Sequence, residues 1–152
     1  MAKGKQKSNT LPYQTTKEGD RLTPIFWQMM EGKAWGELSG NDIKIYLYMA
    51  KKVTTVYSMH QVVSTNKDDI TVPRKEYRGE DLTQKWIIKL GVGTFNDGVD
   101  NLINLGFVKV NGYKFLRGNK RVIIYGMNEM WVHYGTSKFH IKEDWKRKSN
   151  RE

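Results

Sequence analysis

The stretch that decides the fold is DLTQKWIIKLGVGTFNDGVDNLINLGFVKV, residues 81–110. Its first part predicts a helix over residues 82–90, because Asp81 suits an N-cap and apolar residues recur there at helical spacing. Gly91-Val92-Gly93 predicts a tight turn after that helix, since glycine adopts positive φ at little steric cost. The stretch therefore begins as two helices joined by a short turn.

The second helix is predicted over residues 94–105. Thr94 and Asp97 match a capping box, and Gly106 suits the position that follows a helix C-terminus. Gly98 interrupts this helix at the edge of its apolar stripe, which predicts close packing against another helix. Side chains expected in the core, here and elsewhere, are Leu47, Trp86, Val92, Phe95, Val99, Leu102, Phe107 and Ile123.

A β-hairpin is predicted next, from strands over about 107–111 and 121–126. The segment between them contains two turn dipeptides, Asn111-Gly112 and Gly118-Asn119. Farther upstream, residues 69–72 fit a short strand that pairs with this hairpin, and Pro73 favours a helical turn through Tyr77.

The N-terminal half predicts two more helices. Ser39 and Asp42 form a capping signature that opens a helix over about 42–53. Its expected apolar face holds Ile43, Tyr46, Leu47, Ala50 and Val53. Thr23-Pro24 favours a short extra helix that ends at Gly32. The segment from Val56 to Thr65 is compatible with a loop or with a ragged helix end.

Several short patterns together resemble a known family. They are Leu-Thr-Gln at 82–84, Leu-Gly-Val at 90–92, Thr-Phe at 94–95, and Leu-x-x-Leu-Gly-Phe-Val at 102–108. The chain is similar there to winged helix-turn-helix DNA-binding proteins of bacterial mobile elements, which regulate replication or transcription. Trp131 and Tyr134-Gly135 extend the resemblance, which covers roughly residues 22–140. It implies an α+β winged helix-turn-helix, with a three-helix core, a β-hairpin wing and an extra N-terminal helix.

Composition favours an acidic partner. The chain of 152 residues carries a net charge of +10 and no cysteine, which suits nucleic acid as partner and a cytoplasmic location. No apolar run approaches the length of a membrane span and no signal peptide is evident, so we expect no membrane partner. We divide the chain into a basic flexible arm (1–20), a winged-helix domain (21–137) and a basic tail (138–152).

The positive charge flanks the second helix of the stretch and avoids it. Residues 107–124 have a net charge of +5, whereas residues 91–106 have a net charge of −2. We therefore expect hairpin cations to contact phosphate, and polar side chains on the helix to discriminate bases. The candidate DNA-binding residues are Thr94, Asn96, Asp97, Asn101 and Asn104 on the helix, and Lys114, Arg117, Lys120 and Arg121 on the hairpin. The alternative is that the helix binds a second protein.

No motif for catalysis, metal binding or a cofactor is evident: His60, His133 and His140 lack ligand spacing, and Gly91-Val-Gly93 lacks the remainder of a phosphate loop. We therefore expect a non-enzyme without a cofactor. The main hypothesis is a double-stranded DNA binder that regulates transcription, plasmid replication or segregation of a mobile element. We expect a homodimer, with Trp27 and Met30 as the first candidate contact. The alternative is a winged-helix protein-interaction module with only non-specific nucleic-acid contact.

Overall fold

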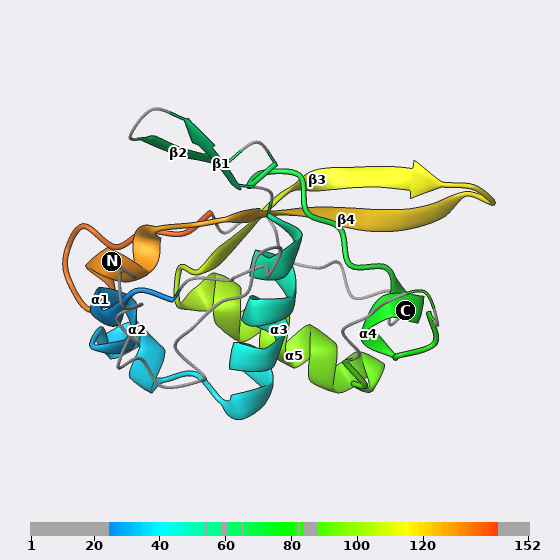
Figure 1. The fold of residues 1–152 in the computed structure, drawn as a ribbon. Helices are drawn as coiled ribbons and strands as arrows, with labels where there is room; N and C mark the ends of the chain where they lie inside the picture. Colours follow the sequence, from blue (N-terminus) through cyan, green and yellow to red (C-terminus); the bar gives the residue numbers. More distant parts are fainter. Residues whose placement is uncertain are drawn as a thin grey trace, which may run out of the picture.

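Five α-helices and two antiparallel β-hairpins make up the part of the chain that the computed structural model describes, which is residues 25–53, 55–58, 61–64, 66–81, 83 and 88–142 (Figure 1). The class is therefore mixed α+β. The helices are α1 (Trp27–Met30), α2 (Lys33–Gly36), α3 (Gly40–Lys52), α4 (Arg74–Tyr77) and α5 (Val92–Asn104). The strands are β1 (Thr55–Ser58), β2 (Gln61–Ser64), β3 (Val108–Leu116) and β4 (Lys120–Met127), and a 3-10 turn, η2 (Met130–His133), follows β4.

Helix α3 confirms the predicted helix over 42–53 and its capping signature. The Ser39 hydroxyl accepts a hydrogen bond from the Asp42 backbone N at 3.2 Å, and the Asp42 carboxylate accepts one from the Ser39 backbone N at 2.8 Å. Its predicted apolar face was wrong in phase, because Leu47 is only half-buried. Tyr46 is buried as predicted, and the other buried apolar residues of the helix are Ile45, Tyr48 and Met49.

Packing between α3 and α5 explains both which face of α3 is buried and why residue 98 is a glycine. A Cβ atom at Gly98 would meet Ile45 Cδ1 and would lie 3.1 Å from Asp42 Oδ1. A larger residue at position 98 would have to displace the Ile45 side chain, so glycine favours the close approach of the two helices that the sequence predicted. Because Ile45 packs against Gly98, the buried face of α3 is rotated from the predicted stripe, of which Tyr46 is buried and the other residues are half-buried.

The start of α5 differs from the prediction. The helix begins at Val92 with Gly91 as its N-cap, and the cap makes no side-chain hydrogen bond. The predicted capping box of Thr94 and Asp97 is therefore wrong, and Gly91, with φ −63°, does not adopt the positive φ that glycine permits. Helix α5 can begin at Val92 because neither Gly91 nor Gly93 has to adopt a left-handed conformation. Phe95, Val99 and Leu102 are buried as predicted, whereas Val92 is half-buried.

The end of α5 confirms the predicted role of Gly106. Its φ is 82°, its backbone N donates to the Ile103 carbonyl at 3.1 Å, and the Phe107 N donates to the Leu102 carbonyl at 2.9 Å. This pair of bonds is a Schellman motif, which requires a left-handed residue. The motif turns the chain directly from α5 into β3.

The β3–β4 hairpin confirms the predicted strand pair and is longer than predicted. Only the second turn dipeptide forms the turn, where Gly118 and Asn119 both have positive φ. Asn111-Gly112 instead forms a bulge, at which the register shifts. Ile70 pairs with Tyr125 through two backbone hydrogen bonds, of 2.9 and 2.7 Å, which confirms that residues 69–72 approach the hairpin.

The middle of the chain differs most from expectation. Residues 55–58 and 61–64 pair as β1 and β2, so a loop or a ragged helix end was wrong there. The predicted helix over 82–90 falls largely outside the described residues, and so does Trp86. Its described end is not helical: Ile88 is fully buried, and the Leu90 backbone N donates to the Tyr77 carbonyl at 2.8 Å. The helical turn after Pro73 is confirmed as α4.

Phe107 is fully buried in the hydrophobic core. Trp131 stacks on its ring with centroids 5.9 Å apart, so the segment after β4 packs back on the body. Ile123, which was expected in the core, is half-buried. Within the described residues, no helix has both the length and the apolar character needed to cross a bilayer.

Candidate nucleic-acid interface

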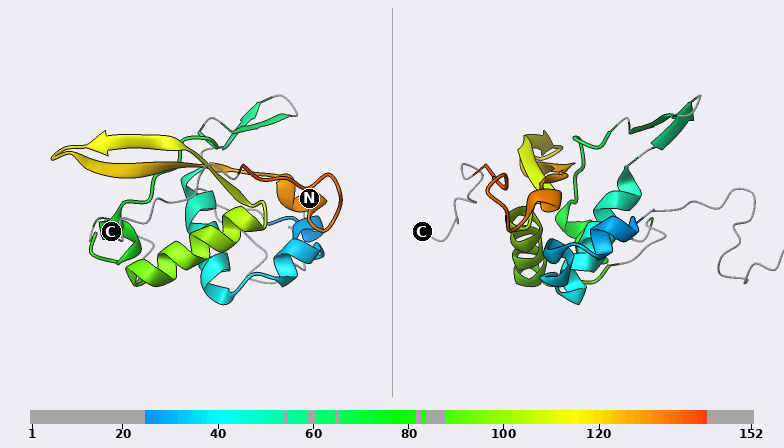
Figure 2. Two further views of the ribbon diagram at one scale, coloured as in Figure 1. Left: turned by 180° about the vertical axis from the view of Figure 1, so that it is seen from behind. Right: turned by 90° about the vertical axis from the view of Figure 1, so that its left-hand side faces the viewer.

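The β3–β4 hairpin concentrates positive charge. Residues 107–127 include five basic residues and no acidic one. The hairpin lies across the helices, and its tip extends beyond them at the end of the molecule opposite to α1 and η2 (Figures 1 and 2). Because a two-stranded ribbon can enter a DNA groove, this projection suits phosphate or groove contact.

The Asn111-Gly112 bulge decides which side chains share a face of the hairpin. Val110 pairs with Tyr125 before the bulge, and Tyr113 pairs with Ile123 after it. Side chains alternate between the faces of a strand, so one extra residue moves every later side chain to the other face. Tyr113 and Phe115 consequently lie on the face of Val110 and Tyr125, and Lys114 lies on the opposite face.

The face of Tyr113 also carries a cation. Phe115 pairs with Arg121 across the hairpin, and the Arg121 guanidinium lies 4.6 Å from the centroid of the Tyr113 ring. Tyr113 and Phe115 remain largely exposed, at 59% and 70%. We call Tyr113, Phe115 and Arg121 the aromatic face of the hairpin.

The opposite face is partly neutralised by the segment that precedes Ile70. Lys109 Nζ lies 3.0 Å from Asp68 Oδ1, and Lys114 Nζ lies 3.8 Å from Asp69 Oδ1. The hydrogen bond from Lys109 is the main cause that holds the pKa of the Asp68 carboxyl below its ordinary value. Lys114, a candidate phosphate contact, therefore already has a partner.

The remaining candidate cations gather at the tip of the hairpin. Among the described residues, none forms an ion pair with Arg117, Lys120 or Arg121. All three side chains are exposed. The structure thus separates the four predicted hairpin contacts into three tip cations and one paired lysine.

Helix α5 presents a polar and acidic outer surface. Of the candidate base-reading residues, Thr94, Asp97, Asn101 and Asn104 are exposed and Asn96 is half-buried. Asn101 is also engaged within the protein, because its Nδ2 lies 3.4 Å from Asp42 Oδ2. The helix carries two aspartates and no basic residue. It therefore offers base-reading groups but no attraction to phosphate.

The helix candidates and the tip cations form two separate groups. The N-terminal half of α5 and the hairpin tip lie toward the same end of the molecule, with α4 between them (Figures 1 and 2). A ligand that contacts both groups must therefore span α4. Duplex DNA is large enough to do so.

A small pocket lies at the base of the hairpin, which the sequence did not predict. Its volume is about 210 Å³, and its polar lining includes Lys109, Asn111, Asn128, His140 and Lys142. His140 and Lys142 belong to the predicted basic tail, so the start of that tail lies beside β3. The rest of the tail, from residue 143, falls outside the described residues, as does the predicted arm over 1–20.

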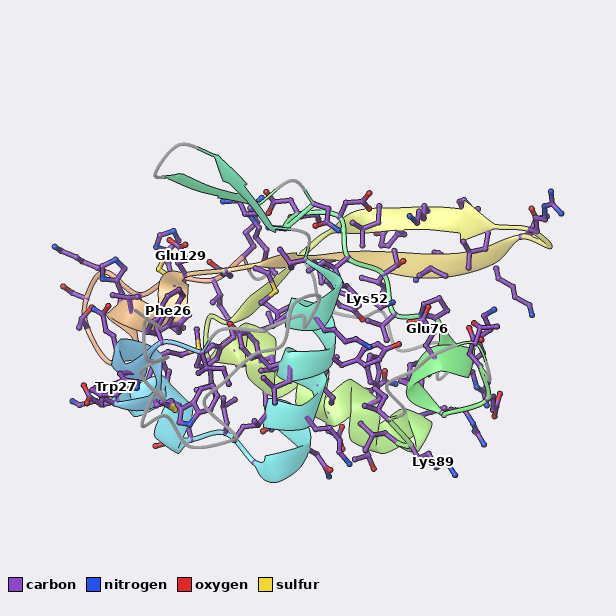
Figure 3. The ribbon with its side chains drawn as sticks, viewed as in Figure 1. Phe26, Trp27, Lys52, Glu76, Lys89 and Glu129 are labelled. Carbon is purple, nitrogen blue, oxygen red and sulfur yellow. The ribbon has the colours of Figure 1, made fainter. Side chains whose placement is uncertain are left out.

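A buried ionisable cluster between α3 and α4 has a structural role. The Tyr48 hydroxyl donates to Glu76 Oε2 at 2.8 Å, and Lys52 Nζ donates both to that oxygen and to the Thr71 carbonyl (Figure 3). Burial, followed by the bond to Glu76, raises the pKa of the Tyr48 phenol above its ordinary value. These contacts tie α4 to the end of α3, and no group of three metal ligands gathers in the described part of the chain.

Exposed apolar side chains gather at the opposite end of the molecule. Phe26, Trp27 and Met30 are 65%, 78% and 45% exposed (Figure 3). The orange turn η2 lies beside α1 in Figure 1, and its residue Val132 is also exposed. We call these four residues the α1 patch.

No protein-family model, curated protein or solved structure matches this chain.

Proposed function

We propose that the protein is a winged helix-turn-helix DNA-binding protein that regulates transcription, replication or segregation of a mobile genetic element in the cytoplasm. The observation that carries the proposal is the projecting hairpin with five basic residues and no acidic one, which follows α5 directly. In this proposal the hairpin is the wing and α5 is the recognition helix. The wing supplies phosphate contacts, and the outer side chains of α5 read bases.

The packing around α5 supports this assignment. Helix α3 packs across α5 at Gly98, and α5 leads through Gly106 into the hairpin. Ile70 adds a short third segment to the hairpin edge through its pairing with Tyr125. Along the chain, α3 is followed by the Ile70 segment, then by α5 and then by the β3–β4 hairpin. A winged helix has its helices and strands in this order.

A mobility-shift experiment tests the proposal. The protein is titrated against labelled duplex DNA pools, first alone and then with excess unlabelled random duplex. Specific binding survives competitor that removes non-specific binding. Selection of bound duplexes from the random pool then identifies the preferred site. Failure to retard any duplex at low salt would overturn the proposal.

The acidic surface of α5 favours a second candidate function. Asp97 is exposed, and no basic residue on α5 offsets its charge. This surface suits a basic region of a protein partner, in which case nucleic-acid contact is non-specific. The competitor experiment separates the two functions, because a protein-interaction module loses all DNA under random competitor.

The first prediction concerns base reading by α5. Asn104→Ala should weaken binding to the preferred site by about 1–3 kcal/mol, because asparagine can bond to adenine through two hydrogen bonds. It should leave the salt dependence unchanged, since no charge is removed. Titrations on the preferred site and on random duplex, at several salt concentrations, measure both effects.

Asn101→Ala provides an internal comparison for that prediction. Its amide also contacts Asp42, so its loss should lower stability as well as affinity. Unfolding curves of both variants separate the two contributions. If Asn104→Ala has no effect on the preferred site, α5 does not read bases at this position.

The second prediction concerns assembly through the α1 patch. We propose that the protein is a homodimer, because a short segment that exposes two aromatic rings and a methionine is typical of an interface. Sedimentation velocity at micromolar concentrations should show a dimer, and Trp27→Ala should shift it toward monomer. Leu116→Ala removes an exposed apolar side chain elsewhere and should leave the dimer intact. A monomeric wild-type protein would contradict the prediction.

A further inference from the structure

We propose that the aromatic face of the β3–β4 hairpin binds unpaired bases by stacking, so that the protein prefers locally melted DNA to fully paired DNA. This inference rests on the proposed function only in that the hairpin must contact nucleic acid. It assigns unpaired bases to the Tyr113 and Phe115 rings, whereas Arg121 contacts phosphate beside them like the other hairpin cations.

Exposure of the two rings is the first observation. Tyr113 and Phe115 are 59% and 70% exposed, although aromatic side chains are usually largely buried. They stand two residues apart on one face of β3, so their attachment points are separated by roughly 7 Å along the strand. Each exposed ring on this face therefore offers a surface on which a base can stack.

The position of Arg121 is the second observation. Its guanidinium already lies 4.6 Å from the centroid of the Tyr113 ring, which shows that a planar group can approach that ring. Arg121 is also the register partner of Phe115 on the neighbouring strand, so all three residues belong to the same face of the hairpin. Aromatic rings that stack on bases beside cations that contact the backbone are the combination by which single strands are bound.

The charge of the hairpin selects nucleic acid over the other possible partners of an exposed aromatic face. With five basic residues and no acidic one in residues 107–127, the hairpin favours a polyanion. A lipid bilayer also attracts cations, but insertion of this face would bury the Arg121 guanidinium among acyl chains. Stacking on bases keeps that group beside phosphate.

The experiment compares three probes of one sequence by fluorescence anisotropy. They are a fully paired duplex, the same duplex with a central block of mismatched bases, and the single strand. The wild-type protein should bind the mismatched duplex roughly tenfold or more tighter than the paired one. The double variant Tyr113→Leu/Phe115→Leu keeps the apolar character but removes the rings, and it should abolish this preference.

Single substitutions and a spectroscopic probe refine the test. Each of Tyr113→Ala and Phe115→Ala should weaken binding to the mismatched duplex by roughly 5- to 150-fold. Tyr113→Phe and Phe115→Tyr retain the rings and should bind as the wild type does, and so should Leu116→Ala on the opposite face. A 2-aminopurine in the mismatched block should lose fluorescence when the wild-type protein binds, and keep it with the double Leu variant.

The outcomes distinguish this inference from the proposed function. Equal binding of paired and mismatched duplex, with an unquenched 2-aminopurine, would overturn the inference and leave duplex binding in place. Binding of unpaired probes without any duplex binding would uphold the inference and overturn the duplex proposal. Binding of anionic vesicles that the double Leu variant retains, without preference for unpaired DNA, would assign the face to a lipid surface and overturn the inference.

Discussion

Replacement of Gly106 by alanine is expected to lower the free energy of unfolding by about 3 kcal/mol or more. Two causes add at this position. The φ of 82° is unfavourable for an L-residue, and a Cβ atom would lie 2.6 Å from the Trp131 backbone N and 2.8 Å from the Met130 carbonyl carbon. Both atoms belong to the backbone of η2, which cannot move aside as a side chain can. Urea unfolding followed by tryptophan fluorescence measures the loss.

Gly118 is a matched control, because it has the same φ of 82° and no atom within 4 Å of its would-be Cβ. Gly118→Ala should therefore show only the backbone strain, about 1 kcal/mol. The difference between the two variants isolates the contact between Gly106 and η2. Equal losses would mean that η2 does not pack on the end of α5 in solution.

The triple variant Arg117→Ala/Lys120→Ala/Arg121→Ala is expected to weaken duplex binding by roughly 500-fold at 0.1 M salt. Each phosphate contact contributes a slope of about 0.9 in log affinity against log salt, and hence roughly eightfold per charge at that concentration. The salt slope should fall by about 2.7 in the triple variant. Affinities measured between low and moderate salt give both quantities.

The control for this prediction is Lys33→Ala, which removes one exposed cation from α2 at the end opposite to the hairpin tip (Figure 1). A single tip substitution such as Lys120→Ala should lower the slope by about 0.9, whereas Lys33→Ala should change it little. Lys114→Ala should have an intermediate effect, because Lys114 already faces Asp69. If the triple variant binds duplex as tightly as the wild type, the hairpin does not contact phosphate.

Local signals explain why much of the fold was predictable. The capping box at Ser39, the apolar stripe of Phe95, Val99 and Leu102, and the glycine at position 106 each act within a few residues. They predicted α3, α5 and the turn into the hairpin within a few residues of the observed bounds. The hairpin segment contains two turn dipeptides, and the sequence could not show which of them forms the turn. Gly118-Asn119 forms it, whereas Asn111-Gly112 forms a bulge.

Long-range packing explains most of what was missed. Which face of α3 is buried depends on its contact with Gly98, which is far from Ile45 in the sequence. The apolar periodicity of α3 by itself favoured a neighbouring face. The β1–β2 hairpin has no strong turn or alternation signal in the sequence. The start of α5 at Val92 also escaped prediction, because glycine permits a helix as readily as a turn.

In the candidate site too, some features follow from the sequence alone and others depend on long-range packing. The sequence alone determined the excess of positive charge around the hairpin, the absence of basic residues from α5, and the order in which α3, α5 and the β3–β4 hairpin follow one another, since these follow from residue type and local spacing. Only the tertiary structure decided which charges are available. Asp68 and Asp69 reach Lys109 and Lys114 because the segment before Ile70 pairs with the edge of β4. The bulge at Gly112, for its part, places Tyr113, Phe115 and Arg121 on one face, because a single extra residue reverses the alternation of every side chain that follows it.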